Sequence, residues 1–327
     1  MRNVGMAIRR VFAVAAVILL AAGAALAQAY PAKPIRLIVP AAPGGITDIS
    51  ARITADYVGR ALNERVVVEN KAGAGGNLGV DMVAKSPPDG YTLVMVNVGN
   101  VTNNPWLYKD MPFDAMNDLI AVAMIGDAPH AVSSHIGVPA KTLQELITYA
   151  KANPGKLNYG SPGNGTMPHL AGALFARVVG IEIVHVPYRG AGPAAVDLGA
   201  GQIQLTFVGW GSVQNQVRAG TVRVLAVARG ERQKAMPDVP TTAEAGLPNF
   251  EPINWFGVIA PRGTPPAAVA LLHKHVRAML DDAEVMKRLE DSGIEPIRET
   301  TEQFAARIKA DYQKWGEVIR GANIKLD

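Results

Sequence analysis

The sequence predicts an α/β protein of two lobes, in which each lobe is a mainly parallel sheet flanked by helices. Short runs rich in Val, Ile and Leu alternate with segments whose apolar residues recur at helical spacing, a pattern typical of parallel strands joined by helical crossovers. The 327 residues suffice for two such units. Because no repeat or low-complexity linker separates them, we expect a chain that passes between the lobes more than once, as hinged two-lobe proteins do.

The first predicted strand is 35–39, and a Gly-rich turn separates it from a helical pattern formed by Ile49, Ile53, Val58 and Leu62. The other predicted strands are 66–69, 91–96, 121–126, 130–136, 157–159, 183–186, 203–208, 222–227 and 254–260. The later predicted helices are 142–152, 168–179, 193–200, 265–280 and 301–320. Three helix starts have local signals: Thr142 with Glu145 and Thr300 with Gln303 have capping-box spacing, and Thr264 precedes a proline at the first helical position.

The N-terminus predicts a cleaved secretory signal peptide, residues 1–29, and therefore a periplasmic protein. Three arginines precede the apolar run 11–22, and small residues around Ala27 fit a cleavage site. The alternatives are a retained anchor and, from Arg9-Arg10, export by the twin-arginine route. No later stretch is long enough to cross a bilayer. The absence of cysteine excludes a lipoprotein anchor and a disulfide framework.

The composition gives no case for a nucleic-acid partner. The formal net charge is +4, and three arginines would leave with the leader, so the mature chain is near +1. Aromatic residues are few and are not interleaved with basic clusters.

A Gly-rich loop from Val39 to Asp48 joins the first strand to its helix. Gly44 and Gly45 let the backbone turn tightly, and Thr47 or Asp48 can cap the helix. The free N–H groups and the dipole of a helix N-terminus favour an anion. The alternative is a plain strand–turn–helix connection.

A second loop, from Tyr159 to His169, follows the same logic. Ser161 and Thr166 add hydroxyl donors to a backbone shaped by glycines that include Gly163. Two such nests of donors, facing each other across a cleft, would share one carboxylate. His169 either donates to this ligand or is a structural residue early in its helix.

Motifs for catalysis and for cofactors are missing. In Gly73–Gly79, Leu78 stands where a dinucleotide fingerprint has its third glycine. Gly160-Ser161 lacks the intervening residue of a nucleophile elbow, and the histidines show no metal spacing. We therefore expect a binding protein without enzymatic activity, cofactor or metal.

Several short motifs in a specific order carry a family resemblance. They are Pro43-Gly44-Gly45-x-Thr47-Asp48, Gly73-Ala74-Gly75-Gly76-Asn77, Pro88-Asp89-Gly90-Tyr91-Thr92-Leu93, Tyr159-Gly160-Ser161-x-Gly163-x-Gly165-Thr166, Val186-Pro187-Tyr188-Arg189-Gly190-Ala191-Gly192-Pro193-Ala194, Ala219-Gly220 and Ala260-Pro261-Arg262-Gly263-Thr264-Pro265. With these motifs the mature chain resembles the substrate-binding proteins of tripartite tricarboxylate transporters, the Bug receptors.

The resemblance implies a Venus-flytrap fold, with lobe 1 formed by 30–127 and 230–327 and lobe 2 by 128–229. It implies a small organic carboxylate held between the two loops, membrane subunits of a transporter as partners, and a monomer. The residues carried over as ligand contacts are Gly44, Gly45, Thr47, Asp48, Ser161, Gly163, Thr166 and His169, with Gly190 and Ala191 as further contacts.

The sequence departs from the family pattern at two places where specificity would be set. Trp210 follows Val208-Gly209, where relatives often have an acidic residue, and Asn100-Val101 replaces the usual Thr-His. We hypothesise a pocket for a carboxylate with an apolar or aromatic body, with Trp210 as a wall and Asn100 as a contact. The alternative for Trp210 is packing between the lobes.

Two functions remain open at the level of the sequence. The first is a receptor that delivers its ligand to a transporter, and the second is a sensor subunit that presents the ligand to a membrane signalling protein. An exported hydrolase is disfavoured because nucleophile and metal patterns are absent.

Overall fold

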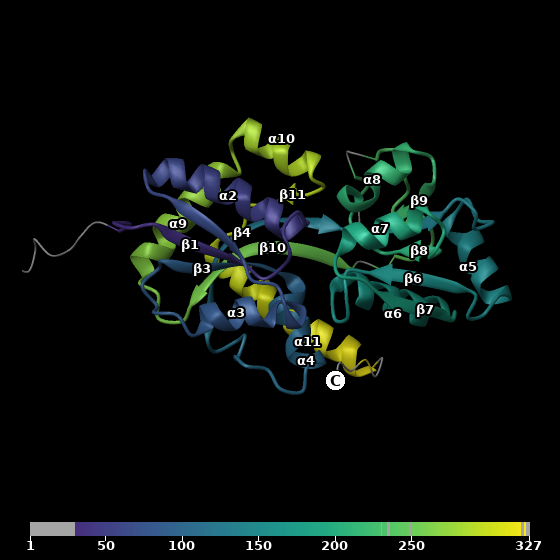
Figure 1. Cartoon of the computed structure of the whole chain (residues 1–327), viewed down its shortest axis with the longest axis horizontal. Coiled ribbons are helices and arrows are strands. Elements are labelled where there is room, and N and C mark those ends of the chain that lie inside the picture. The colour runs from purple at the N-terminus through teal and green to yellow at the C-terminus, as the bar shows by residue number, and fades with distance from the viewer. Residues whose placement is uncertain are drawn as a thin grey trace, which may run out of the picture.

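The computed structural model describes residues 30–229, 231–233, 236–248, 250, 252–321 and 324. Two lobes lie side by side, and extended strands run from one into the other (Figure 1). The predicted signal peptide, 1–29, lies outside the described residues. No helix in the described part of the chain is long and apolar enough to span a membrane.

Lobe 1 contains a six-stranded sheet of order β11-β4-β10-β3-β1-β2. Its strands are β1 (Ile35–Val39), β2 (Val66–Asn70), β3 (Thr92–Asn97), β4 (Leu119–Pro129), β10 (Ile253–Pro261) and β11 (Glu295–Pro296). Its helices are α2 (Ile46–Leu62), α3 (Asn77–Ala84), α4 (Asn104–Leu107), α9 (Pro266–Met279), α10 (Ala283–Asp291) and α11 (Thr301–Gly321), with a 3₁₀ turn η1 (Ala74–Gly76) and a π-helix η2 (Gly99–Asn103). Apolar side chains of α2, α9 and α10 pack on one face of the sheet, and those of α3, α4 and α11 on the other (Figure 1).

Lobe 2 contains a five-stranded sheet of order β7-β6-β8-β5-β9. Its strands are β5 (Ala131–His135), β6 (Leu157–Ser161), β7 (Ile183–Pro187), β8 (Leu205–Thr206) and β9 (Val222–Val227). Helices α5 (Leu143–Ala152) and α6 (Met167–Val179) pack on one face, and α7 (Ala191–Gly199) and α8 (Trp210–Arg218) on the other.

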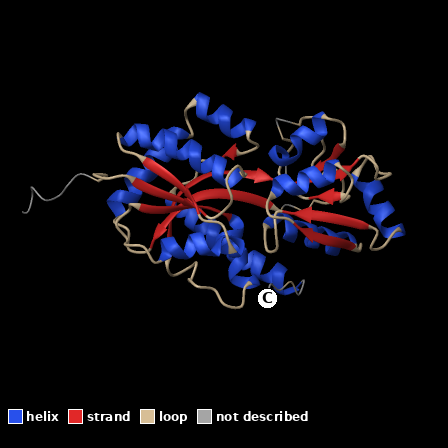
Figure 2. Cartoon of the chain, viewed as in Figure 1, coloured by secondary structure: helices blue, strands red, loops and turns tan. Residues whose placement is uncertain are grey.

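Both sheets are mixed, whereas the sequence predicts mainly parallel sheets. The strands joined by helical crossovers, such as β1 with β3 and β6 with β7, are parallel. The strands by which the chain passes between the lobes are antiparallel, since β4 pairs with β10 and β5 pairs with β9. The chain leaves lobe 1 at the end of β4 and returns to it at the start of β10, where Ile253 is paired with Pro129. The two-lobed α/β fold is nevertheless confirmed (Figure 2).

One of the two predicted capping boxes forms completely, at Thr300 and Gln303, and the other forms in part, because Glu145 accepts from Lys141 N–H and not from Thr142 N–H. Thr142 Oγ1 accepts from Glu145 N–H, and Thr300 and Gln303 exchange hydrogen bonds between side chain and backbone. The third predicted start is wrong in detail, because Thr264 Oγ1 donates to Pro261 O and the helix begins at Pro266. Helices α3, α4, α8 and α10 and strand β11 were not predicted, and β8 has two residues where 203–208 was expected.

Candidate functional site: the cleft between the lobes

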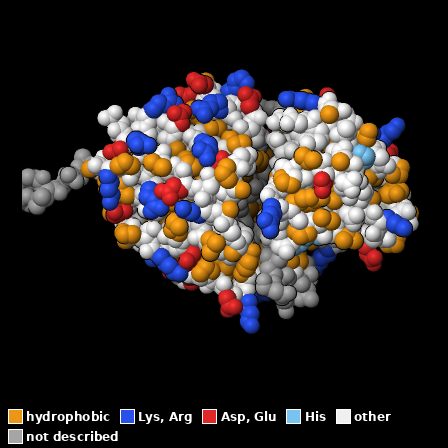
Figure 3. Space-filling view, viewed as in Figure 1, with side chains coloured by type: hydrophobic (Ala, Val, Ile, Leu, Met, Phe, Trp, Pro, Cys, Tyr) orange, Lys and Arg blue, Asp and Glu red, His pale blue; other side chains and the backbone are white. Residues whose placement is uncertain are grey.

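The carboxyl ends of the parallel strands in both sheets face the junction of the lobes. Helix α2 follows β1, while α6, α7 and α8 follow β6, β7 and β8, so four helices begin at this edge. The two edges approach closely: a Cβ on Gly209 would lie 3.4 Å from Ile46 Cδ1, and one on Gly99 would lie 3.9 Å from Gly165 O. The space-filling view shows a groove between the lobes (Figure 3). Ligands of open α/β sheets bind at such edges.

The lobe 1 loop turns at Gly44, whose φ of +85° favours glycine, and α2 begins after the N-cap residue Gly45. Gly44 and Gly45 are exposed, and Thr47 is buried in the first turn. Neither Thr47 nor Asp48 caps the helix, because no side chain bonds to the N-terminal N–H groups. The N–H groups of the first turn have no partner within the helix and remain available to an anion.

Asp48 braces this loop from inside. Its buried carboxylate accepts hydrogen bonds from Gly44 N–H (2.9 Å), from the Arg52 guanidinium (2.9 and 3.0 Å) and from Asn70 Nδ2 (2.9 Å). Burial opposes ionisation, but the hydrogen bonds from Arg52, Gly44 and Asn70 outweigh it and hold the pKa of Asp48 below its ordinary value. The carboxylate is therefore ionised and neutralised by Arg52 at neutral pH, and it fixes Gly44 in place.

The lobe 2 loop is held by its own hydroxyl groups. Thr166 Oγ1 donates to Gly163 O (2.7 Å), and Ser161 Oγ accepts from Gly163 N–H (3.2 Å). Gly163 has a φ of +144°, a conformation that side chains rarely adopt. Thr166 is the N-cap residue of α6 but makes no side-chain cap, so the first-turn N–H groups of α6 are also free of side-chain partners.

Two stacked imidazoles lie against this loop. His169 Nδ1 accepts from Gly165 N–H (3.1 Å), and His185 Nε2 lies 2.7 Å from the buried Ser161 Oγ. Burial lowers the pKa of His169 to about 4 and that of His185 to about 3, and the neighbouring His169 adds to the second shift. Both rings are therefore neutral at pH 7 and serve as hydrogen-bonding supports of the loop. No local pattern in the sequence indicates the role of His185, which lies on β7.

The remaining predicted residues lie at the same edge of the sheets. Gly190 is the N-cap residue of α7, and Ala191 begins that helix. Trp210 begins α8 and, half-buried, packs with Ala191 on the small apolar cluster of lobe 2. Asn100 lies in η2, but its amide is engaged within lobe 1: Oδ1 accepts from Asn97 N–H, and Nδ2 donates to Gly75 O.

The glycines of η1 let Asn100 and the lobe 1 loop pack closely together. A Cβ on Gly76 would lie 2.3 Å from Asn100 Nδ2 and 2.9 Å from Pro40 O. The segment interpreted from sequence as a tight connection thus packs beneath the loop that starts at Pro40. Among the described residues, no group of three or more His, Cys, Asp or Glu side chains could hold a metal ion.

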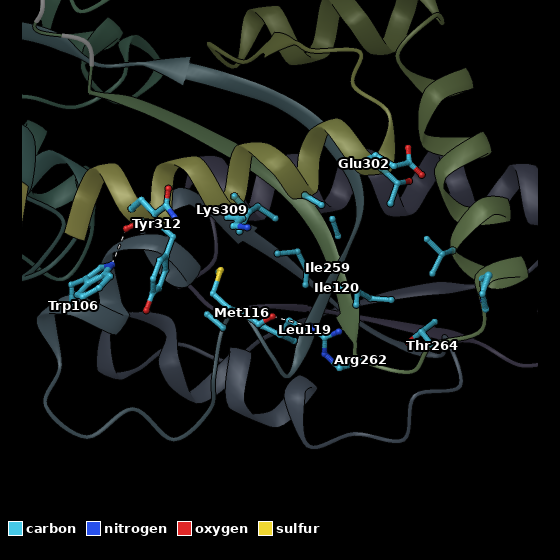
Figure 4. Close-up of a pocket in the computed structure, with 18 of the residues that line it drawn as sticks. Trp106, Met116, Leu119, Ile120, Ile259, Arg262, Thr264, Glu302, Lys309 and Tyr312 are labelled. Atoms are coloured by element: carbon cyan, nitrogen blue, oxygen red, sulfur yellow. Dashed lines mark hydrogen bonds between the residues drawn. The ribbon is translucent and has the colours of Figure 1, made fainter. Parts of the chain in front are cut away.

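A cavity of about 1150 Å³ lies elsewhere, on lobe 1 between α9 and α11 (Figure 4). Trp106, Met116, Ile120, Ile259 and Tyr312 line it, and none of the predicted ligand contacts does.

The comparisons with known proteins agree with this geometry. The model of the tripartite tricarboxylate transporter family receptor (TctC) matches residues 50–324. Protein BugT of Bordetella pertussis is 36% identical over 97% of this chain and 98% of its own. A solved structure described as a periplasmic transporter is 42% identical, with a TM-score of 0.86, and the match covers 91% of this chain and 100% of that one.

Two further solved structures contain ligands. Rpa4515 of R. palustris, determined with adipate, is 33% identical with a TM-score of 0.86, covering 90% of this chain and 99% of that one. MatC from Rhodopseudomonas palustris, with bound malate, is 31% identical with a TM-score of 0.82, covering 89% and 100%.

The fold and the cleft together define a two-lobed solute-binding protein similar to known periplasmic binding proteins. The chain belongs to the tripartite tricarboxylate transporter receptor family, and its Bug-named relatives place it among the Bug receptors.

Proposed function

We propose that this protein captures a small organic carboxylate between its lobes and delivers it to the membrane subunits of a tripartite tricarboxylate-type transporter. The observation that carries the proposal is the convergence of four helix N-termini, those of α2, α6, α7 and α8, on one cleft. Each N-terminus presents free N–H groups and a partial positive charge, so donors from both lobes favour one anion.

The charges around the lobe 1 loop are compatible with an anionic ligand. Asp48 is the buried acidic group there, and its charge is offset by the Arg52 guanidinium, with which it forms two hydrogen bonds. In the proposed site Asp48 acts through Gly44 as a positioning residue. The proposed ligand contacts are Gly45, Thr47, Ser161, Gly163, Thr166, Gly190 and Ala191, with His169 and Asn100 supporting them and Trp210 beside the ligand body. The N–H groups of Gly163 and Gly190 already donate to Ser161 Oγ and Pro162 O, so these two glycines contribute through the shape of the backbone.

Adipate and malate in two relatives indicate the size of the cargo. We propose a carboxylate of similar size with an apolar or aromatic body, since Trp210 stands in the first turn of α8. Export by a cleaved signal peptide of residues 1–29 and action in the periplasm as a monomer, without catalysis, complete the proposal.

A thermal-shift screen of the purified protein against mono-, di- and aromatic carboxylates tests it. A ligand present at about 100 times its Kd stabilises the folded state by roughly 2.7 kcal/mol, which raises Tm by several degrees. We expect at least one carboxylate to do so, and the matching neutral amide to have no effect. Folded, ligand-free protein that responds to none of them refutes carboxylate capture. Loss of uptake of the same carboxylate in a deletion strain tests the coupling to transport.

A further inference from the structure

The π-helix η2 presents one polar group that the fold leaves unpaired. Asn100 Nδ2 donates to Gly75 O, and Asn104 Nδ2 donates to Gly75 O and Asn77 Oδ1. Asn103 Nδ2, in contrast, is fully buried and has no hydrogen-bond partner. A buried N–H group without a partner is destabilising, and an acceptor supplied by water or by a ligand relieves that cost.

The unpaired amide lies where the two lobes meet. A Cβ added to Gly99 would lie 3.1 Å from Asn97 Oδ1, 3.8 Å from Asn103 Nδ2 and 3.9 Å from Gly165 O. Gly165 belongs to the lobe 2 loop proposed to hold the carboxylate. The unpaired amide of lobe 1 and a carbonyl acceptor of lobe 2 therefore both lie close to Gly99, where the lobes meet.

The orientation of Asn103 is fixed by its neighbour. The Thr102 hydroxyl lies within hydrogen-bonding distance of Val98 O (2.6 Å) and of Asn103 Oδ1 (2.8 Å), and Thr102 is fully buried. The Thr102 hydroxyl thus links Asn103 Oδ1 to the backbone carbonyl of Val98, which fixes the orientation of the Asn103 amide. π-Helical turns occur frequently at functional sites, and here the turn follows β3 at the edge of the sheet where ligands bind.

A ligand group that reaches Asn103 Nδ2 also approaches the acceptor oxygens Asn97 Oδ1 and Gly165 O, and a hydroxyl group suits this place because it accepts one hydrogen bond and donates another. A carboxylate oxygen there would accept from Asn103 but would be repelled by the two acceptor oxygens. We infer that Asn103 is a specificity-determining residue that binds a hydroxyl group of the ligand, so that the protein prefers a hydroxycarboxylate to its deoxy analogue. The inference rests on the proposed capture of a carboxylate between the lobes.

The test compares carboxylates that differ by one hydroxyl group: malate with succinate, lactate with propionate, and mandelate with phenylacetate. Kd is measured by calorimetry for the wild type, for Asn103→Leu, which has nearly the same shape, and for Thr102→Val, which releases the amide. Asn215→Leu is the control, because Asn215 is exposed on α8. Circular dichroism and Tm verify that each variant is folded.

In the wild type we expect a preference on the order of tenfold for the hydroxylated member of at least one pair, the effect of one satisfied hydrogen bond in a buried site. Asn103→Leu abolishes this preference while affinity for the deoxy member is kept, Thr102→Val reduces it, and Asn215→Leu leaves it unchanged. If Asn103→Leu does not fold, the ratio in Thr102→Val decides.

Three results overturn the inference. A hydroxyl preference that survives in both variants assigns the hydroxyl to other groups. An equal loss of affinity for both members of each pair shows that Asn103 pairs directly with Gly165 across the closed lobes. Wild-type protein that binds these or other carboxylates without any hydroxyl preference refutes the inference alone, whereas failure to bind any carboxylate refutes the proposed function.

Discussion

The imidazole rings of His169 and His185 stack face to face, with centroids 3.9 Å apart and an interplanar angle of 15°. One ring accepts from Gly165 N–H and the other contacts Ser161 Oγ, so the pair supports both ends of the lobe 2 loop. Two neutral rings stack without repulsion, whereas protonation of either places a charge in a half-buried site.

This arrangement predicts acid sensitivity. In the folded state the pKa values are about 4 and about 3, whereas both histidines titrate near 6.5 when unfolded. Between about pH 6.5 and 4 the unfolded chain binds more protons, so these residues lower the free energy of unfolding as the pH falls through that range. His185→Gln removes one such group, and its loss of stability between pH 7.5 and 5 should be smaller by roughly 1–2 kcal/mol. Denaturant unfolding at the two pH values measures this, and equal losses in both proteins would contradict it.

A second prediction concerns the brace at Asp48. Asp48→Ala leaves Gly44 N–H and Asn70 Nδ2 without their acceptor, so we expect a loss of about 1–3 kcal/mol in the free energy of unfolding and weaker ligand binding. Asp56→Ala on the same helix is the matched control, because its ion pairs are exposed and should change stability by no more than about 0.5 kcal/mol. Equal effects of the two substitutions in denaturant unfolding would show that Asp48 has no bracing role.

A third prediction distinguishes an effect on ligand binding from a general loss of stability caused by backbone strain. Gly163 and Gly180 both have positive φ, but Gly163 lies in the lobe 2 loop and Gly180 is the C-cap residue of α6. Alanine at either position should cost about 1 kcal/mol of stability. Only Gly163→Ala should also weaken carboxylate binding, by on the order of tenfold, which calorimetry measures. If Gly180→Ala weakens carboxylate binding equally, binding does not depend specifically on the conformation of the lobe 2 loop.

A fourth prediction concerns the base of the hinge. Arg229, on the segment that leaves lobe 2, lies 3.3 Å from Asp127 Oδ1 and 2.5 Å from Glu295 Oε2. Burial raises the pKa of Asp127 to about 6, against the opposing effect of Arg229. Arg229→Met leaves two acidic groups together and should destabilise the protein by about 3 kcal/mol, and Asp127→Asn in that background should restore part of the loss. A double variant no more stable than Arg229→Met in thermal unfolding would refute this coupling.

The sequence predicts best those elements whose signal is local. Strands 35–39 and 222–227 consist of β-branched and aliphatic residues with a single arginine in each, Arg36 and Arg223, and both were predicted with their observed bounds. Helix α10 was missed because it is short and largely polar, although Asp282 caps it. Helix α8 begins at Trp210 with Gly209 as its N-cap residue, and the apolar run that ends at Val208 predicts a longer strand than β8.

The candidate site follows the same rule. Gly44 and Gly163 were found from the sequence because a glycine-rich turn between a strand and a helix is a local pattern. The role of Asp48 depends on Asn70, 22 residues away, and that of Ser161 on His185, 24 residues away. Such contacts are set by the packing of parallel strands, so sequence spacing alone does not reveal them.

The central claim, capture of a carboxylate between the lobes, is tested most directly by the distance between them. The chain contains no cysteine, so Lys85→Cys on lobe 1 and Lys151→Cys on lobe 2, both exposed, accept spin labels selectively. Pulsed electron paramagnetic resonance then measures the distance distribution with and without the carboxylate that gives the largest thermal shift. We expect the bound carboxylate to close the lobes, so that the distribution of distances between the two spin labels becomes narrower and shifts to shorter values. The neutral amide analogue should leave the distribution unchanged. An identical distribution with and without saturating carboxylate would contradict the claim.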